Sequence, residues 1–192
     1  MLEVIWSYLP YVIVTTFTPG PNNIMTLYAV STLGWRKGSR VILGIVCGFL
    51  VVMLTTILFC HELAQYAPGV IEYLKYFGAA YILWLAVHIA LSTPANTNEH
   101  SINFKSGFLL ALSNMKVILY LITLFTAFVI PSGANFFEML LHGAFVISLS
   151  AVSWGLWGTA GGLLQKFLVR YYRPFNILMG LILALCAVKI LM

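Results

Sequence analysis

The sequence lacks most of the residues and motifs on which enzymes rely. It contains no aspartate, and Asp, Glu, Lys and Arg together make up only 8% of its 192 residues. The missing aspartate excludes an aspartyl protease pair and phosphoryl transfer at an aspartate-bound metal. GxxxxGK[ST] and GxSxG do not occur, and Gln65 stands where the zinc protease motif begun by His61-Glu62 needs its second histidine. We therefore expect no enzyme, no catalytic residues and no nucleotide-binding motor.

Cysteine is also scarce. The three cysteines, Cys47, Cys60 and Cys186, lie inside apolar runs and show no CxxC spacing. These cysteines suggest no disulfide framework and no metal site, and we expect no metal and no cofactor. We interpret the cysteines as small core residues. The chain opens Met1-Leu2-Glu3 without a basic segment, so a cleaved signal peptide is not expected either.

Apolar residues are what the sequence has in excess, since they make up 61% of the chain. A soluble domain is roughly half apolar and a quarter charged, and this composition could not supply its polar shell. The sequence therefore predicts an integral membrane protein. The net charge of +5 does not favour nucleic-acid binding, because most basic residues stand in short clusters between apolar runs, where they act as topology anchors.

Apolar segments of about 20 residues, long enough to cross a bilayer, recur along the chain. They cover approximately 4–33, 41–60, 71–91, 106–130, 139–164 and 175–192. Only the stretch 92–105 reads as a polar loop. We expect an all-α membrane protein with about six transmembrane helices, forming a single domain over 1–192. Its half-repeats would cover about 1–91 and 106–192.

Lysine and arginine gather in alternate connections between these segments. The clusters are Arg36, Lys37 and Arg40 after the first segment, Lys105 after the third, and Lys166, Arg170 and Arg173 after the fifth. Cytoplasmic loops carry the excess of basic residues, so we expect both termini in the periplasm. Two halves with an odd number of helices each would have opposite orientations, which is the inverted repeat of many secondary transporters.

A proline–glycine group interrupts the first segment. Two prolines around a glycine predict a broken helix, because proline lacks an amide hydrogen and clashes with the preceding turn. In hydrocarbon the freed backbone groups need partners from protein or a wet cavity, and the amide end of such a break attracts a carboxylate. A purely structural kink is the alternative. The residues that we interpret as substrate-binding here are Pro19, Gly20, Pro21, Asn22 and Asn23.

A second polar group, Ser113-Asn114-Met115-Lys116, interrupts the fourth segment. Lys116 lies about 15 Å from the start of that segment at 1.5 Å per residue, and a charge at such depth is expensive and by default functional. We interpret Asn114 and Lys116 as substrate-binding, with the lysine neutralising a carboxylate. If the membrane span begins nearer Lys116, the lysine instead snorkels to the cytoplasmic face.

Two further ionisable residues, His88 and Glu72, are weaker candidates, for proton coupling. A histidine titrates in a range suited to that task, but His88 also fits an interfacial position near the end of the third segment. Glu72 stands three residues before Lys75, so the two can pair on one helix face. Both alternatives stay open.

The likeness to a known family rests on four stretches in order along the chain. They are TPGPNN at 18–23, the glycine-punctuated stretch 34–48, GAAYILWLA at 78–86 and SNMKVILY at 113–120. The sequence resembles the LysE/RhtB family of amino-acid exporters. By position, the family's Pro-Gly motif falls on Pro19, Gly20, Pro21 and Asn22, and its Asn-Pro-Lys motif on Asn114 and Lys116. Met115 replaces the proline of the second motif, as in a variant whose fourth helix is less sharply broken.

The resemblance implies six transmembrane helices in the bacterial inner membrane and export driven by an ion gradient, with the proton as the expected ion. The expected function is secondary active export of small amino acids or derivatives, cysteine and O-acetylserine among them, by alternating access. The expected partners are an amino-acid substrate and the lipid bilayer, with no nucleic acid, and the protein acts as a monomer or a homo-oligomer. The alternative is a channel or uncoupled pore for small polar solutes.

Overall fold

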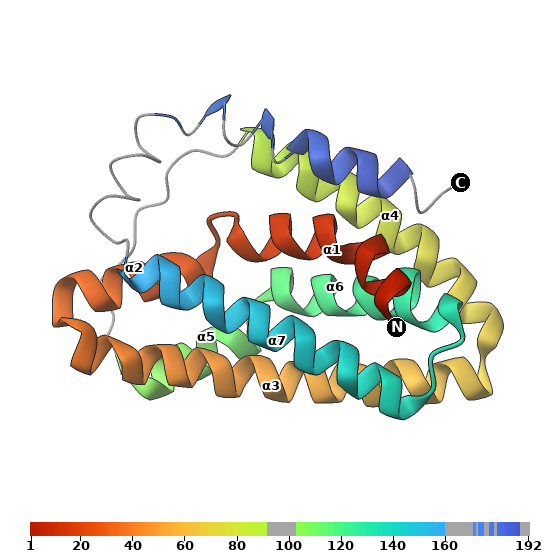
Figure 1. Ribbon diagram of the computed structural model, residues 1–192, viewed down its shortest axis with the longest axis horizontal. Helices are drawn as coiled ribbons and strands as arrows, with labels where there is room; N and C mark the ends of the chain where they lie inside the picture. Colours follow the sequence, from red (N-terminus) through yellow and green to blue (C-terminus); the bar gives the residue numbers. More distant parts are fainter. Residues whose placement is uncertain (92–102, 160–170, 172, 175–176, 179, 189–192) are drawn as a thin grey trace.

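Helices make up all the regular structure that the computed structural model describes (Figure 1). The description covers residues 1–91, 103–159, 171, 173–174, 177–178, 180–188, and no strand occurs within these ranges. Most of the helices run along one long axis and form a bundle (Figure 1). The predicted all-α class is confirmed.

The first apolar segment is broken at the predicted place. α1 (Leu2–Phe17) and α2 (Pro21–Leu33) are separated by the three residues 18–20. Pro21 begins α2, where a missing amide hydrogen removes no helical hydrogen bond. A further proline, Pro10, lies inside α1, and the first turns of that helix lean away from the rest (Figure 1). A proline in a helix commonly produces such a bend.

The next helix is longer than predicted. α3 (Trp35–Tyr66) extends beyond 41–60 at both ends, so the basic cluster 36–40 lies in its first turns and not in a connection. Gly34 alone separates α2 from α3, with a φ of 73° that favours glycine. Because one residue makes this turn, the helix can begin earlier than hydropathy indicates. α4 (Pro68–Leu91) follows.

The fourth segment, predicted as one span over 106–130, is divided into two helices. α5 covers Phe104–Leu112 and α6 covers Met115–Leu124, and the chain continues through the short helices η1 (Phe125–Val129) and η2 (Ile130–Ser132). The side chain of Asn114 accepts a hydrogen bond from the Lys116 amide at 3.1 Å and so caps α6. An asparagine cap thus begins α6, although Met115 replaces the proline of the motif. The break between α5 and α6 is two residues long, against three between α1 and α2.

Three helical stretches within the described ranges are long and apolar enough to cross a membrane. They are Trp35–Tyr66, Met115–Ser132 and Phe136–Thr159, the last of which is α7. Shorter apolar helices cover Leu2–Phe17 and Tyr76–Val87. The sixth predicted segment, 175–192, falls partly outside the described residues. The count of six spans and the two half-repeats therefore stay predictions.

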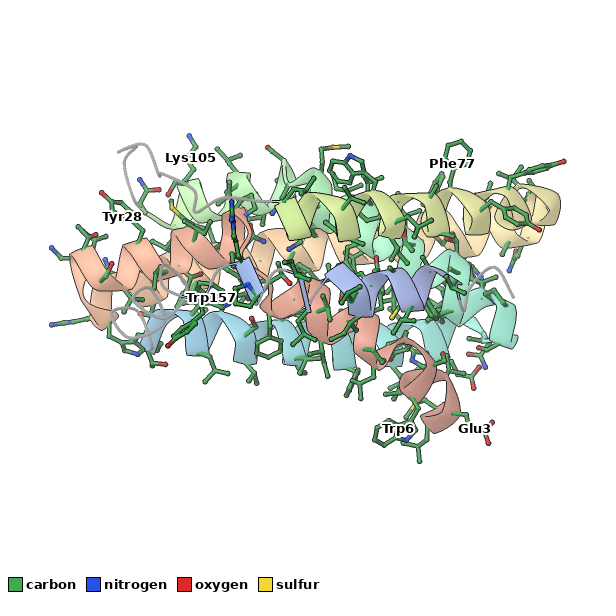
Figure 2. The ribbon with its side chains drawn as sticks, turned by 90° about the horizontal axis from the view of Figure 1, so that it is seen from above. Glu3, Trp6, Tyr28, Phe77, Lys105 and Trp157 are labelled. Atoms are coloured by element: carbon green, nitrogen blue, oxygen red, sulfur yellow. The ribbon has the colours of Figure 1, made fainter. Side chains whose placement is uncertain are left out.

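Large apolar side chains cover the outside of the bundle. Trp6 and Phe77 project outward (Figure 2) and are 70% and 74% exposed. An apolar exterior of this kind costs free energy in water but not in lipid. The surface agrees with a membrane-embedded chain.

Candidate functional site

The two helix breaks meet inside the bundle. Asn114 donates a hydrogen bond from Nδ2 to Oδ1 of Asn22 at 3.2 Å, and both side chains are buried. Asn22 lies in the first turn of α2 and Asn114 caps α6, so two helix N-termini converge here. Each N-terminus carries unpaired N–H groups and a partial positive charge. Their convergence favours an anionic group.

Lys116 adds a full positive charge to this place. Its Nζ lies 3.5 Å from the carbonyl oxygen of Thr18, across the first break. A Cβ atom on Gly20 would lie 3.2 Å from the same Nζ, so the glycine leaves room for the ammonium group. The half-buried lysine follows the whole of α5 and points at the break. This arrangement favours the interior interpretation over snorkelling.

Carbonyl oxygens at the end of α1 form the other side of the break. Asn23 donates from Nδ2 to the carbonyl oxygens of Thr16 and Thr18, at 2.8 and 2.9 Å. Ser153 of α7 also donates to the Thr16 oxygen, at 3.1 Å. These bonds satisfy backbone groups that the break frees. Both amide hydrogens of Asn23 are therefore engaged in holding the break together.

A small cavity of about 40 Å³ lies between these groups, with room for about three water molecules. Its lining residues are Thr15, Thr16, Gly20, Pro21, Asn22, Asn23, Phe49, Asn114, Lys116, Val117, Tyr120, Ser150 and Trp154. The residues predicted to bind substrate thus come together from both breaks. Pro19 is the exception, because it does not line the cavity.

The walls of the cavity were missed in the sequence. Phe49 and Trp154 meet edge to face, with ring centroids 5.5 Å apart. The buried hydroxyl group of Thr15 has no hydrogen-bond partner within the described part of the chain. Such a group commonly faces water or a ligand. The threonines could have been predicted from the sequence, because their hydroxyl groups stand inside an apolar segment. The aromatic residues of the wall could not, because aromatic residues also pack in the core of any helical bundle.

The two weaker candidates cannot be placed at the site. Glu72 and His88 belong to α4, but their side chains lie outside the described residues. Their role in proton coupling stays a prediction. Among the residues that are described, no three histidine, cysteine or acidic side chains gather as a metal site requires.

Comparison with known proteins agrees with the motifs at both breaks. The family model of the LysE type translocator matches residues 13–192. The chain is similar to the cysteine/O-acetylserine efflux protein of Salmonella choleraesuis, with 38% identity covering 99% of this chain and 97% of that protein. The protein of the same name from Escherichia coli K12 is 34% identical with the same coverage. No solved structure matches. The chain is thus a multi-pass membrane transporter and belongs to the LysE type translocator family.

Proposed function

We propose that this protein exports small neutral amino acids or their derivatives, cysteine and O-acetylserine foremost, out of the cytoplasm across the bacterial inner membrane. The observation that carries the proposal is the convergence of the α2 and α6 N-termini on a cavity that also holds the Lys116 ammonium group. Paired helix breaks of this kind form the substrate sites of other secondary transporters. The similar proteins from Salmonella and E. coli have cysteine/O-acetylserine efflux in their names.

The head group of the substrate fits the charges at the two breaks. Its carboxylate binds Lys116 and the N–H groups of the converging helix ends. Lys116 then turns from the Thr18 carbonyl, which lies 3.5 Å from its Nζ, and this oxygen becomes available to the substrate's ammonium group. Asn22 offers a further acceptor through Oδ1, at present occupied by Asn114. Asn23 acts on the substrate indirectly, because it holds the carbonyl groups in place.

The side-chain end of the cavity favours a neutral substrate. Phe49, Trp154 and Ser150 supply two aromatic surfaces and one hydroxyl group. None of the described lining residues is acidic. If the substrate were lysine or arginine, the positive charge of its side chain would be buried without a counter-charge. A thiol or an acetyl ester carries no such penalty.

Transport requires the cavity to open. A cavity with room for about three water molecules is tight for cysteine or O-acetylserine, so the substrate enters from a wider state. A broken helix begins each predicted half, at 18–20 and 113–114, and the two breaks meet at the cavity. This placement supports alternating access by rocking of two inverted halves. We propose that proton entry drives it.

The test is efflux from cells that overproduce the protein and are loaded with labelled cysteine, O-acetylserine, threonine or lysine. We expect cysteine and O-acetylserine to leave, lysine to stay, and a protonophore to stop the export. Loss of every solute down its gradient, insensitive to the protonophore, would indicate a channel. No efflux from protein shown to be in the membrane would contradict the proposal.

The Lys116→Met variant sharpens this test, because it keeps an apolar stem but removes the counter-charge of the carboxylate. We expect export to fall to background with the protein still in the membrane. The matched control is Lys37→Met, which removes an exposed lysine of the basic cluster on α3 and should leave export unchanged. Near-normal export by Lys116→Met would remove the lysine from the site.

A further inference from the structure

His142 of α7 is a buried ionisable residue that the substrate site does not use. Its side chain is 2% exposed, and its Nδ1 lies 2.9 Å from the hydroxyl oxygen of Tyr8 on α1. The Tyr8 ring packs edge to face against both the histidine ring and Phe128, with centroids 5.6 and 6.4 Å apart. An ionisable side chain inside a membrane protein is expensive to keep, and its usual reason is function.

Charged groups near His142 lie toward the end of the molecule that holds the N-terminus. Glu138 lies one turn earlier on α7, is partly exposed, and accepts a hydrogen bond from the Asn135 amide at 2.9 Å. His61 of α3 contacts Phe136 in the first turn of α7, with ring centroids 5.0 Å apart. A Cβ on the next residue, Gly143, would have side-chain atoms of Met53 and Ile57 on α3 as its nearest neighbours. His142 therefore stands between polar groups at one end and the core.

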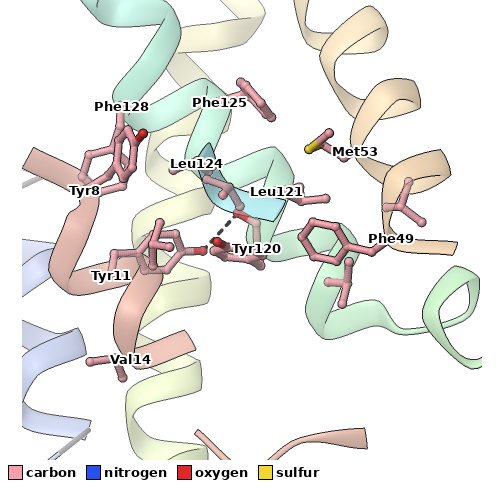
Figure 3. Packing of buried hydrophobic residues seen from close by; sticks show 14 of the residues in the cluster. Tyr8, Tyr11, Val14, Phe49, Met53, Tyr120, Leu121, Leu124, Phe125 and Phe128 are labelled. Atoms are coloured by element: carbon pink, nitrogen blue, oxygen red, sulfur yellow. Dashed lines mark hydrogen bonds between the residues drawn. The ribbon is translucent and has the colours of Figure 1, made fainter. Parts of the chain in front are cut away.

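A continuous set of contacts leads from His142 to the substrate cavity. One turn after Tyr8, Tyr11 donates a hydrogen bond from its hydroxyl group to the backbone oxygen of Tyr120, at 3.2 Å (Figure 3). The two rings pack with centroids 5.5 Å apart. The Tyr120 side chain lines the cavity, and the end of α1 is bound there by Ser153. α1 is thus hydrogen-bonded to His142 of α7 at one end. Toward its other end it is hydrogen-bonded to Tyr120 and Ser153, beside the substrate site.

We propose that His142 is the proton-binding residue of this exporter and that Tyr8 is its hydrogen-bond partner. The inference rests on the proposed function and adds the residue that couples export to the proton gradient. A proton from water at the N-terminal end binds an imidazole nitrogen and forms imidazolium. When the protein opens to the opposite side, the imidazolium releases this proton to the water there, so a proton enters as substrate leaves.

Protonation changes the bond that ties α1 to α7. Neutral imidazole can accept a hydrogen bond at Nδ1, but imidazolium donates from both nitrogens. The Tyr8 oxygen must then accept, and its own hydrogen must turn elsewhere. Because α1 ends at the Thr16 and Thr18 carbonyls, a shift in this helix reaches the groups that face the substrate. Such a two-state element, biased by both ligands, is what coupling requires.

The test uses purified protein in proteoliposomes and the His142→Gln variant. Glutamine can keep a hydrogen bond to Tyr8 but cannot take up a proton at physiological pH. We expect the wild type to exchange labelled for unlabelled O-acetylserine at equal pH, to accumulate it in an acidic lumen, and to raise the lumenal pH as it does so. His142→Gln should keep the exchange and lose both the accumulation and the pH change. His61→Gln, at the same end of the bundle, should behave as the wild type.

Several outcomes would overturn the inference. One is acid-driven accumulation by His142→Gln at the wild-type level, and another is equal loss of exchange and accumulation in a variant that melts like the wild type. If His142→Gln is unstable, Tyr8→Phe decides instead: exchange should persist while the pH of half-maximal accumulation moves, and an unmoved value contradicts the inference. Wild-type exchange that ignores pH refutes the coupling alone, whereas no exchange at all refutes the proposed function.

Discussion

Three asparagines supply hydrogen bonds at the two helix breaks. Asn114 caps α6 with its side-chain oxygen and donates to Asn22 with its nitrogen. Asn23 donates both of its side-chain hydrogens to carbonyl oxygens at the end of α1. An amide side chain suits this task, because it donates and accepts hydrogen bonds without bringing a charge into a buried place. Prolines open the first break, and asparagines stabilise both.

Replacing Asn23 by leucine should therefore destabilise the protein. The Thr16 and Thr18 carbonyl oxygens each lose one buried hydrogen bond, and we expect the free energy of unfolding to fall by about 1–3 kcal/mol. Thermal unfolding in detergent, followed by loss of monodisperse protein, measures the change. The control is Thr55→Val, which removes an exposed hydroxyl group bonded to its own helix and should change the melting temperature little. Equal melting of wild type and Asn23→Leu would show that the break needs no such support.

Site residues with a polar or charged side chain inside an apolar segment could be predicted from the sequence. Site residues that stand out only by their position in the fold could not. A lysine and asparagines inside apolar segments are costly, so their presence predicts a site. Phe49 and Trp154 carry no such signal, because aromatic residues are ordinary packing in any membrane helix. His142 sits in an apolar segment in the same way as Lys116, but its meaning depends on Tyr8, which is 134 positions away in sequence.

At the scale of elements, α3 and α5 cross with their backbones in contact. A Cβ on Gly48 would lie 2.6 Å from the carbonyl oxygen of Phe108 and 2.8 Å from Cβ of Ala111. A Cβ on Gly44 would overlap the Phe104 carbonyl. Small residues four positions apart, as at 44 and 48, let two membrane helices approach this closely. This crossing joins the first predicted half to the second.

The Gly48→Ala substitution should weaken that crossing. The added methyl group has no room against α5, so the helices must separate, at a cost of about 1–3 kcal/mol. Gly155→Ala is the matched control, because nothing described lies within 4 Å of its added Cβ and alanine favours a helix by up to about 1 kcal/mol. We expect a lower melting temperature for the first variant and an equal or higher one for the second. A Gly48→Ala protein that melts at least as high as Gly155→Ala would contradict this account of the crossing.

The first break was predicted better than the second break and the helix ends. Proline marks the first break because it cannot continue a helix, so its position was fixed to within a residue or so. The second break is made by Asn114, and asparagine is common both inside and outside helices, so hydropathy alone joined 106–130 into one span. The ends of α3 were missed because basic residues fit a helix as well as they fit a loop.

At the scale of the whole molecule, charge is divided between the two ends of the bundle. Lys105 and Glu3 lie at opposite ends of the long axis (Figure 2). Arg36, Lys37 and Arg40 begin α3 at the end where α2 finishes, whereas Glu138 begins α7 near the N-terminal end. Basic residues anchor the cytoplasmic side of a membrane protein. The asymmetry therefore supports the predicted orientation, with the N-terminus outside.

Reporter fusions test this orientation. A fluorescent protein that matures only in the cytoplasm should stay dark when fused after Met192, and a reporter active only in the periplasm should work there. The control is the same fluorescent protein fused after Arg40, within the basic cluster, where a bright signal is expected. Bright cells from the Met192 fusion would contradict the periplasmic C-terminus. Together with a dark Arg40 fusion, they would reverse the topology and move the proton-accepting end to the cytoplasm.

The bonds across the two breaks also govern what the protein does when it is empty. Asn114–Asn22 and Lys116–Thr18 each join one predicted half to the other, and the same groups are those that a substrate would engage. An arriving amino acid must therefore compete with the protein's own contacts, and it releases them as it binds. A ligand shifts a conformational equilibrium only by the difference in its affinity for the two states. The substrate therefore favours the state in which these contacts are broken. A transporter closed by contacts between its own binding residues would stay shut when empty. Under the proposed proton coupling, this would limit proton entry that is not matched by export.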